Sequence, residues 1–356
     1  MKTINGLSLF SSAGIAEMNL AKCGIKIKLA NELIPIRAKT HEYWHPQAKM
    51  ICGDVTKDEI KQQIIKESLN KKIEFVLATP PCQGVSLIGK NKTNDEMLDD
   101  QRNFLIFHAF EIIDQINPKV VVIENVDRFL TMKFPYDNGY YNIEYIVRKK
   151  YGSKYSINVT VYNAQDYGVP QSRKRVIIVM TNSEYTFEEP KKQKMITVRQ
   201  AIGDLPSLES GEVSNLKNHY ARKHTEAHIL CMKHTPTGHS AFENKYYFPK
   251  NKDGRRLKGY SATYKRIEWD KPAPTITMRN DAISSQSNVH PGRLLPDGTY
   301  SDARVLTLRE LFILSSINPD LEIPRFTTDI QVRFMIGEAI PPKLLESVCK
   351  CIKEAK

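Results

Sequence analysis

One cysteine of the chain lies where a nucleophile would be expected. Cys82 follows an apolar stretch at residues 74–78 that is typical of a buried strand, and it stands in the sequence Pro80-Pro81-Cys82-Gln83. The two prolines restrict the backbone of this loop and would present the thiol at the edge of a sheet. A thiolate there could attack an electrophilic carbon. A lone cysteine is more often a small buried apolar residue, so Cys82 alone leaves both interpretations open.

Charged residues at two later strand patterns could act on the same substrate. Glu124 closes the apolar stretch 120–124, and Arg173 and Arg175 stand at the start of another strand pattern. In an extended strand, side chains two residues apart point to the same face, so both guanidiniums are expected beside one ligand. An ordinary surface strand could carry two arginines with the same spacing. The shared substrate is therefore a hypothesis at this point.

The N-terminal part of the chain carries a pattern expected of an adenosine pocket. Five residues, the last four of them small, form the turn between the first strand and the first helix: Phe10, Ser11, Ser12, Ala13 and Gly14. Glu32 ends the second strand pattern, where an acid commonly holds ribose hydroxyls. Asp54 ends the third and could accept a hydrogen bond from an adenine amine. Each acid alone could equally cap a helix, but three such groups at successive strand ends favour one pocket.

An alternation of strand and helix patterns would position these residues. Seven stretches are apolar and strand-like: residues 4–10, 26–31, 50–53, 74–78, 120–124, 155–162 and 176–180. Helical patterns lie among them: residues 14–23, a segment from 35, and residues 58–69 and 102–116. Gly24 is typical of a helix C-cap and Pro35 of a first helical turn. This order predicts an α/β fold, a mostly parallel sheet with helices on both faces, which binds ligands at the carboxyl ends of its strands.

Charge and a change of pattern near residue 190 indicate a second domain. Lys and Arg outnumber Asp and Glu by 52 to 40, and the net charge of +12 favours a polyanionic partner such as nucleic acid. Between residues 207 and 300 the periodicity is weak, and basic residues outnumber acidic ones by 15 to 9. We predict a catalytic and cofactor-binding domain at 1–190, a smaller irregular domain at 191–302, and a C-terminal return to the first domain at 303–356.

In their order and approximate spacing, these motifs resemble the DNA (cytosine-5)-methyltransferase family, in particular its prokaryotic restriction–modification type. The resemblance covers residues 4–206 and 303–350, and the segment between them lies where the family has its target-recognition domain. The matching pieces are 10–14, Glu32, Asp54, Pro81-Cys82-Gln83, Glu124-Asn125-Val126, 171–175, 199–206 and 337–342. The sequence departs from the family pattern at Ser12 and Ile15, where glycine is common, and at Glu338, where asparagine is common.

The resemblance implies a Rossmann-like, S-adenosyl-L-methionine-dependent methyltransferase that modifies C5 of a cytosine in duplex DNA. Cys82 would add to C6 of the cytosine and thereby make C5 nucleophilic. Glu124 would contact N3 and the exocyclic amine, and Arg175, with Arg173 beside it, would hold the O2 side. Because the target carbon is inaccessible inside a duplex, the base would have to be flipped out.

The resemblance also implies binding residues. Contacts to the methyl donor are expected from Phe10, Ser11, Ser12, Gly14, Glu32, Asp54 and Pro80. Contacts to DNA are expected from Gln83, Ser86, Arg102, Thr275 and Arg279. A loop at 84–103 would close over the DNA, and Arg279 and Arg293 could read guanines in the major groove. The histidine-rich stretch 219–239 invites a zinc interpretation, but it lacks a CxxC pair, and we expect no metal.

Other functions stay open from the sequence alone. An RNA cytosine-5 methyltransferase would use the same catalytic set, although the basic insert favours duplex DNA. A catalytically silent DNA-binding homologue would not need Cys82, Glu124 and Arg175 together. A nicotinamide-binding enzyme would require a GxGxxG sequence after the first strand, and none is present there.

The setting is expected to be that of a bacterial restriction–modification system. The protein would protect DNA from a cognate restriction endonuclease, act as a monomer, and be cytoplasmic and associated with the nucleoid. Six cysteines without a CxxC pair fit a reducing compartment. No apolar run of about 18 residues is present, so we expect no membrane span.

Overall fold

The computed structural model describes residues 3–81 and 104–355 of the chain. Four predicted functional residues, Cys82, Gln83, Ser86 and Arg102, lie outside this part, as does the whole of the predicted loop 84–103. The chain divides into two compact units. The first comprises residues 1–163, 174–191 and 344–356, and the second comprises residues 164–173 and 192–343.

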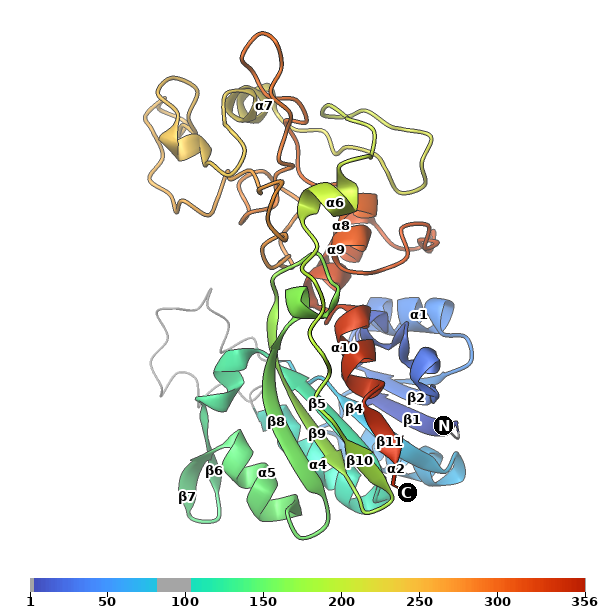
Figure 1. The fold of residues 1–356 in the computed structure, drawn as a ribbon. Helices are drawn as coiled ribbons and strands as arrows, with labels where there is room; N and C mark the ends of the chain where they lie inside the picture. The colour runs from blue at the N-terminus through green and yellow to red at the C-terminus, as the bar shows by residue number, and fades with distance from the viewer. Residues whose placement is uncertain (1–2, 82–103, 356) are drawn as a thin grey trace. The chain divides into compact units, whose positions relative to one another are not determined.

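A seven-stranded sheet forms the frame of the first unit (Figure 1). Its order is β3-β2-β1-β4-β5-β9-β8, in which β1 to β5 are parallel and β9 runs antiparallel to both of its neighbours. The strands are β1 (Ile4–Leu9), β2 (Ile25–Glu32), β3 (Lys49–Cys52), β4 (Ile73–Ala78), β5 (Val120–Asn125), β8 (Ser156–Asn163) and β9 (Lys174–Thr181). The predicted α/β fold with a mostly parallel sheet is thus confirmed.

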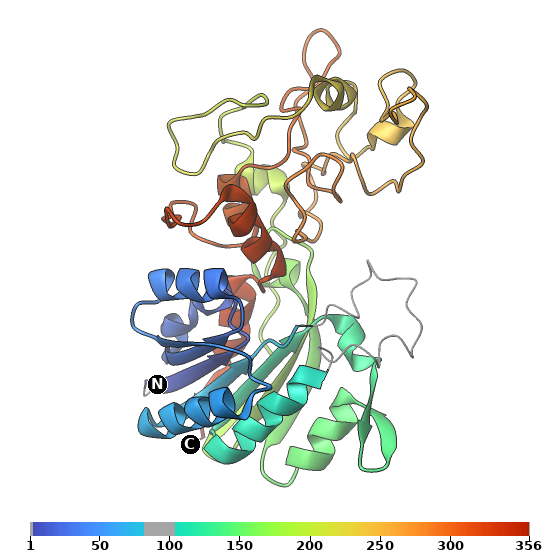
Figure 2. The same ribbon diagram turned by 180° about the vertical axis from the view of Figure 1, so that it is seen from behind.

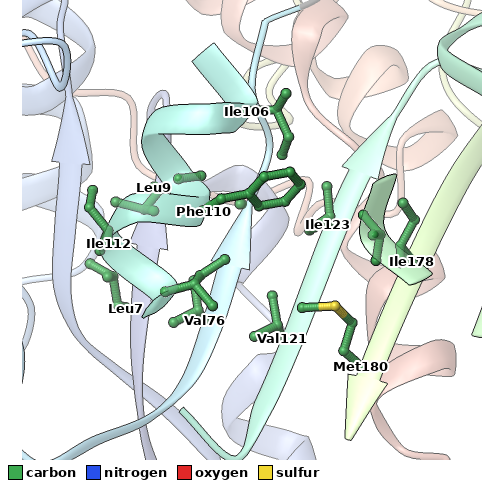
Figure 3. Close-up of a cluster of buried hydrophobic side chains, with 14 of the residues drawn as sticks. Leu7, Leu9, Val76, Ile106, Phe110, Ile112, Val121, Ile123, Ile178 and Met180 are labelled. Carbon is green, nitrogen blue, oxygen red and sulfur yellow. The ribbon is translucent and has the colours of Figure 1, made fainter. Parts of the chain in front are cut away.

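Helices α2 (Asp58–Asn70), α4 (Leu105–Ile116) and α5 (Ile143–Tyr151) cover one face of this sheet (Figure 2). Apolar side chains of α4, among them Phe110, pack onto Val76, Val121 and Ile178 of three adjacent strands (Figure 3). Most of α10 (Pro342–Cys349) belongs to the first unit and lies on the opposite face (Figure 1). Burial on both faces explains why the strands read as continuous apolar runs in the sequence.

Short elements complete the first unit. Helix α1 (Pro35–Trp44) begins at the predicted proline and packs against β2 and β3. The remaining elements are η5 (Asp127–Leu130), β6 (Lys133–Tyr136), β7 (Gly139–Asn142), β10 (Tyr185–Phe187) and β11 (Ile352–Glu354). No helix of the described residues is both long and apolar enough to cross a membrane.

The predicted helix at 14–23 is wrong. Two single-turn 3-10 helices replace it, η1 (Ile15–Glu17) and η2 (Leu20–Cys23). The segment lies between two glycines with left-handed backbone, Gly14 (φ 76°) and Gly24 (φ 73°). A continuous α-helix confined between them would be short and therefore only marginally stable. Gly24 does close η2 as a C-cap, as predicted.

The second unit has little regular structure. Its elements are η6 (Ala164–Tyr167), α6 (Val198–Ile202), α7 (Glu226–Lys233), η7 (Ala241–Glu243), α8 (Leu308–Leu314) and α9 (Asp329–Glu338). At its centre Arg304 is fully buried and pairs with Asp302 at 2.8 Å and with Glu310 at 2.9 Å. Paired charges and many side chain–backbone hydrogen bonds thus replace sheet ladders as the source of order here.

The compact units divide the chain at other positions than the predicted domains. The long segment of the second unit begins at Lys192, next to the predicted boundary at 190. The chain returns to the first unit at Leu344, whereas the predicted return is at residue 303. The reason is that α8 and α9 pack within the second unit, where α8 also contacts α6. Which segment recognises the DNA target stays a prediction.

Candidate active site

The turn after β1 has an unusual backbone. Phe10 (φ 59°), Ser12 (φ 48°) and Gly14 (φ 76°) all adopt left-handed conformations. Such conformations are uncommon for residues other than glycine and cluster at ligand-binding sites. The turn is held by hydrogen bonds from the Ser11 N–H to the Asn31 carbonyl at 3.0 Å and from the Gly14 N–H to the Ser11 carbonyl at 2.9 Å. Its shape is therefore fixed by the protein itself.

Glu32 joins this turn to the start of α1. One carboxylate oxygen, Oε2, accepts the Ser12 N–H at 2.9 Å, and the other, Oε1, accepts the Ile34 N–H at 2.9 Å. The guanidinium of Arg37 lies 4.0 Å from Oε1, and the Glu32 residue is only 6% exposed. A carboxylate offers about four lone-pair positions. Two backbone donors therefore leave acceptor capacity for the two hydroxyls of a ribose.

The register of the sheet brings the three predicted adenosine contacts to one edge. Leu9 of β1 lies opposite Asn31 of β2, and Glu32 lies opposite Cys52 of β3. The turn, Glu32 and Asp54 thus follow three adjacent parallel strands. The half-buried Asp54 accepts the Thr56 N–H at 2.9 Å through Oδ1, which fixes the orientation of its carboxylate.

Asn31 is a structural residue of this edge that the sequence analysis did not single out. Its side-chain amide donates to the carbonyl oxygens of Ile51 at 2.9 Å and Gly53 at 3.0 Å. The bonds tie the end of β2 to the chain leaving β3, and the Asn31 side chain is buried. A buried amide at a strand end is a recognisable signal of such cross-linking, because an unpaired amide there would be costly.

The loop that leads toward Cys82 is tied to the neighbouring strands as far as it is described. The Thr79 hydroxyl donates to the Phe10 carbonyl at 3.0 Å, and the Asn125 amide donates to the Pro80 carbonyl at 3.1 Å. Pro80 is buried. The chain therefore reaches Cys82 from a point fixed to the carboxyl ends of β1 and β5.

Glu124 and Arg175 form an ion pair at the same sheet edge. The Arg175 Nε lies 2.9 Å from Glu124 Oε1, and the two side chains are only 13% and 11% exposed. In the antiparallel pairing of β5 and β9, Glu124 lies opposite Ile177, which places it near Arg175. A second donor, Nη1 of Arg175, binds the Lys174 carbonyl at 2.6 Å. The pair presents a carboxyl of fixed orientation at the end of β5.

Arg173 has different surroundings from those predicted. It precedes β9, belongs to the second unit and is only 2% exposed. Its guanidinium donates to the carbonyl oxygens of Ile276 at 2.8 Å, Gly337 at 2.8 Å and Glu338 at 3.2 Å. The last two carbonyls end α9, where they have no partner within the helix. The structure thus gives Arg173 a role in holding the second unit together.

The predicted DNA-contacting residues of the second unit differ in their surroundings. Arg279 has a side chain that is 67% exposed and bonds Asp281 at 3.1 Å, and the exposed Thr275 donates to the Ser172 carbonyl at 2.7 Å. The guanidinium of Arg293, in contrast, donates to the Asp302 carboxylate at 3.2 Å and to two backbone carbonyls. These bonds engage the base-reading edge of Arg293 within the protein, which argues against its predicted role.

The histidines of the stretch 219–239 have separate partners. His219 lies between the Thr307 hydroxyl at 3.1 Å and the Pro206 carbonyl at 3.0 Å, and His239 pairs with Glu243. Among the described residues, a single group of three could hold a metal ion, and it lies elsewhere: Glu17, His41 and His45. None of these three residues was predicted from the sequence, although two histidines four positions apart, one in the last turn of a helix and one directly after it, are a visible signal.

The chain is similar to known proteins along nearly its whole length. The family described as C-5 cytosine-specific DNA methylase matches residues 4–354. The type II methyltransferase M1.HgaI of Avibacterium volantium is 48% identical over 98% of both chains. The type II methyltransferase M1.HphI of Haemophilus parahaemolyticus is 28% identical over 97% of this chain and 86% of its own. Among solved structures, the methyltransferase EhMeth of Entamoeba histolytica superposes with a TM-score of 0.63 at 15% identity over 98% of this chain and 97% of its own.

Proposed function

Because the chain belongs to the C-5 cytosine-specific DNA methylase family, we propose that Cys82, Glu124 and Arg175 form the catalytic centre of a DNA (cytosine-5)-methyltransferase that works through a covalent adduct. The observation that carries the proposal is the buried ion pair between Glu124 and Arg175. It lies at the sheet edge from which the Pro80 loop leads to Cys82. Nucleophile, carboxyl and guanidinium would thus meet one flipped-out cytosine.

The residues at the ends of β1, β2 and β3 fit the methyl donor, S-adenosyl-L-methionine. Glu32 would bind the ribose hydroxyls with the acceptor capacity that its two backbone donors leave. Asp54 would accept from the adenine amine, and the turn from Phe10 to Gly14, with Pro80 beside it, would surround the rest of the molecule. When bound there, the donor supplies an electrophilic methyl group on a sulfonium.

In the proposed mechanism the Cys82 thiol first loses its proton to solvent, and the thiolate forms a bond to cytosine C6. The electron pair of the C5–C6 double bond moves toward N3, which takes a proton shared with Glu124. C5 is now nucleophilic and would accept the methyl group, while the electron pair of the broken S–CH3 bond stays on sulfur and leaves a neutral thioether. Loss of the C5 proton to a base such as water then re-forms the double bond and expels the thiolate, and the N3 proton returns to Glu124.

Arg175 has two tasks in this mechanism. Its guanidinium holds the Glu124 carboxyl in one orientation through the 2.9 Å contact. Its remaining donors would stabilise negative charge on the O2 side of the ring as the thiolate adds. Arg173 would act only indirectly, through the carbonyl groups it binds in the second unit.

Duplex DNA is the substrate of this family, and we assign its recognition to the second unit. A surplus of basic residues favours contact with phosphates. Exposed Arg279 and Thr275, together with Gln83, Ser86 and Arg102 from the loop after Cys82, are the proposed contacts. We further propose that the enzyme is a cytoplasmic, nucleoid-associated monomer that protects DNA from a cognate restriction endonuclease, which the names of its type II relatives support.

The test is methyl transfer from labelled S-adenosyl-L-methionine to unmethylated duplex DNA, with RNA as a competing substrate. Wild type and Cys351→Ser, a control at a cysteine outside the proposed site, should label cytosine C5. Cys82→Ser should label nothing while still binding the methyl donor. Transfer that survives in Cys82→Ser would refute the adduct, and transfer to RNA alone would refute the substrate.

A further inference from the structure

A buried cluster lies against the turn that we assign to the methyl donor. Glu17 stands at the end of η1, His41 in the last turn of α1, and His45 directly after α1. All three residues are buried, with exposures of 5%, 0% and 7%. Such ionisable side chains are seldom enclosed without a partner or a task.

Two hydrogen bonds order the cluster. The Nε2 of His41 lies 3.0 Å from the Glu17 Oε2, and the Nε2 of His45 lies 2.9 Å from the Gly14 carbonyl oxygen. A carbonyl oxygen can only accept, so the Nε2 of His45 must carry a proton. Burial lowers the pKa of His45 despite the nearby Glu17 carboxylate, which favours the neutral ring with its proton on Nε2. Burial also opposes the ionisation of Glu17, but the neighbouring polar groups, with His41 the largest contributor, together outweigh it and lower the pKa of that carboxyl.

The two imidazole rings pack directly against Gly14. A Cβ placed on this glycine would lie 2.5 Å from the His45 ring and 2.8 Å from the His41 ring. Gly14 also has the left-handed φ of 76° on which the turn depends. The hydrogen bond from His45 therefore fixes the position of the Gly14 carbonyl, and the two rings leave no room for a side chain at this position.

We infer that His45 is a positioning residue for the methyl-donor site: its hydrogen bond to Gly14, supported by the pair of His41 and Glu17, fixes the turn from Phe10 to Gly14 in its binding shape. This inference rests on the proposed assignment of that turn to the methyl donor. A metal ion is the competing occupant, since the possible ligand atoms lie within 4.8 Å of one another. Both Nε2 atoms already bind protein oxygens, which favours the hydrogen-bonded network.

The test compares His45→Phe, which keeps a ring but removes the donor, with His45→Gln, which places an amide N–H near the position of Nε2. Loss of one neutral hydrogen bond should raise the Kd for S-adenosyl-L-methionine roughly threefold to tenfold in His45→Phe. His45→Gln should restore most of the affinity. The kcat at saturating methyl donor and the Kd for DNA should not change in either variant.

Two control variants separate the possible failures. Phe110→Leu in the core of the first unit should lower the melting temperature without changing the Kd for the methyl donor, which excludes a general loss of stability as the cause. Glu32→Ala should abolish methyl-donor binding; if it does not, the proposed binding site is wrong. If Glu32→Ala fails to bind while His45→Phe binds normally, only the role of His45 is refuted. One equivalent of zinc retained by the wild-type protein and lost in His45→Phe would also refute it.

Discussion

The ion pair between Glu124 and Arg175 makes a quantitative prediction about both stability and catalysis. At an N–O distance of 2.9 Å and an effective dielectric constant of 20, the gross attraction is about 6 kcal/mol. Most of this is offset by the desolvation of two side chains that are only 13% and 11% exposed. We therefore expect a net coupling free energy of about 1–3 kcal/mol between the two residues.

A double-mutant cycle measures this coupling. Arg175→Met, Glu124→Gln and the double variant are unfolded with urea, and the coupling is the departure of their free energies of unfolding from additivity. The control is the pair of Arg148 and Glu144 on α5, which is also separated by 2.9 Å but has side chains that are 49% and 41% exposed. Its coupling should be below about 0.5 kcal/mol, because exposed pairs are well solvated.

Single-turnover methylation of duplex DNA gives the catalytic half of the same test. Each single variant should slow methyl transfer by about 10²–10³-fold, as expected when one stabilising group is lost from a charge-developing transition state. The double variant should be hardly slower than either, because the two groups act as one unit. A coupling no larger than that of the control pair, or rate effects that multiply, would refute the reasoning.

Three further predictions follow from the described residues. Burial lowers the pKa of His290 to about 3. Burial opposes the ionisation of Glu310 and Asp302, but Arg304 and hydrogen bonds outweigh it, so the pKa of Glu310 falls to about 2 and that of Asp302 still further. The unfolded chain therefore binds more protons at all three groups. The stability they contribute is therefore full above pH 6.5, and the melting temperature should fall steadily as the pH is lowered from 6.5 toward 3. Arg173→Met should lower the free energy of unfolding by about 2–4 kcal/mol in urea titrations, since it removes three hydrogen bonds, two of them buried. It should change the kcat of the folded enzyme by less than about threefold, and a drop in kcat comparable to that of Arg175→Met would restore Arg173 to the catalytic centre. Gly14→Ala should weaken methyl-donor binding by at least about tenfold in calorimetry, because the added Cβ meets an imidazole ring at 2.5 Å, and unchanged affinity would show that the turn can shift without cost.

The sheet could be predicted from the sequence to within a few residues at each strand end. Continuous apolar runs mark strands buried on both faces, and an acid such as Glu32 or Glu124 marks the point at which the strand ends. Parallel pairing then brings successive strand ends to one edge, so a local pattern becomes a spatial site. For this reason the sequence could predict that Glu32, Asp54 and Glu124, the residues proposed to bind adenosine and cytosine, lie at one edge of the sheet.

The hairpin of β6 and β7 is absent from the predicted strands, although the sequence of its turn is typical of a hairpin. Its turn contains Asp137 and Asn138 with left-handed φ values of 48° and 62°, followed by Gly139. This is the composition that two-residue hairpin turns require. Helix α5 follows directly, with Asn142 as its N-cap accepting from the Tyr145 N–H at 2.8 Å. Each strand has only four residues, and Phe134 is the single buried residue in the two, so the alternation is too short to predict a strand.

The contacts of Arg173 and His45 could not be predicted from the sequence, because in both cases the partners are distant in the chain. The spacing of Arg173 and Arg175 implies a shared face only if both residues belong to the strand, and β9 begins at Lys174. The partners of Arg173 lie more than 100 residues away, and His45 finds Gly14 across 31 residues. Periodicity describes the faces of one element and contains no information about such contacts. In this chain Glu32, Glu124 and the turn after β1, which are proposed to contact the methyl donor and the cytosine, lie at strand ends and can be found from the sequence. The contacts of Arg173 and His45 become visible only in the structure.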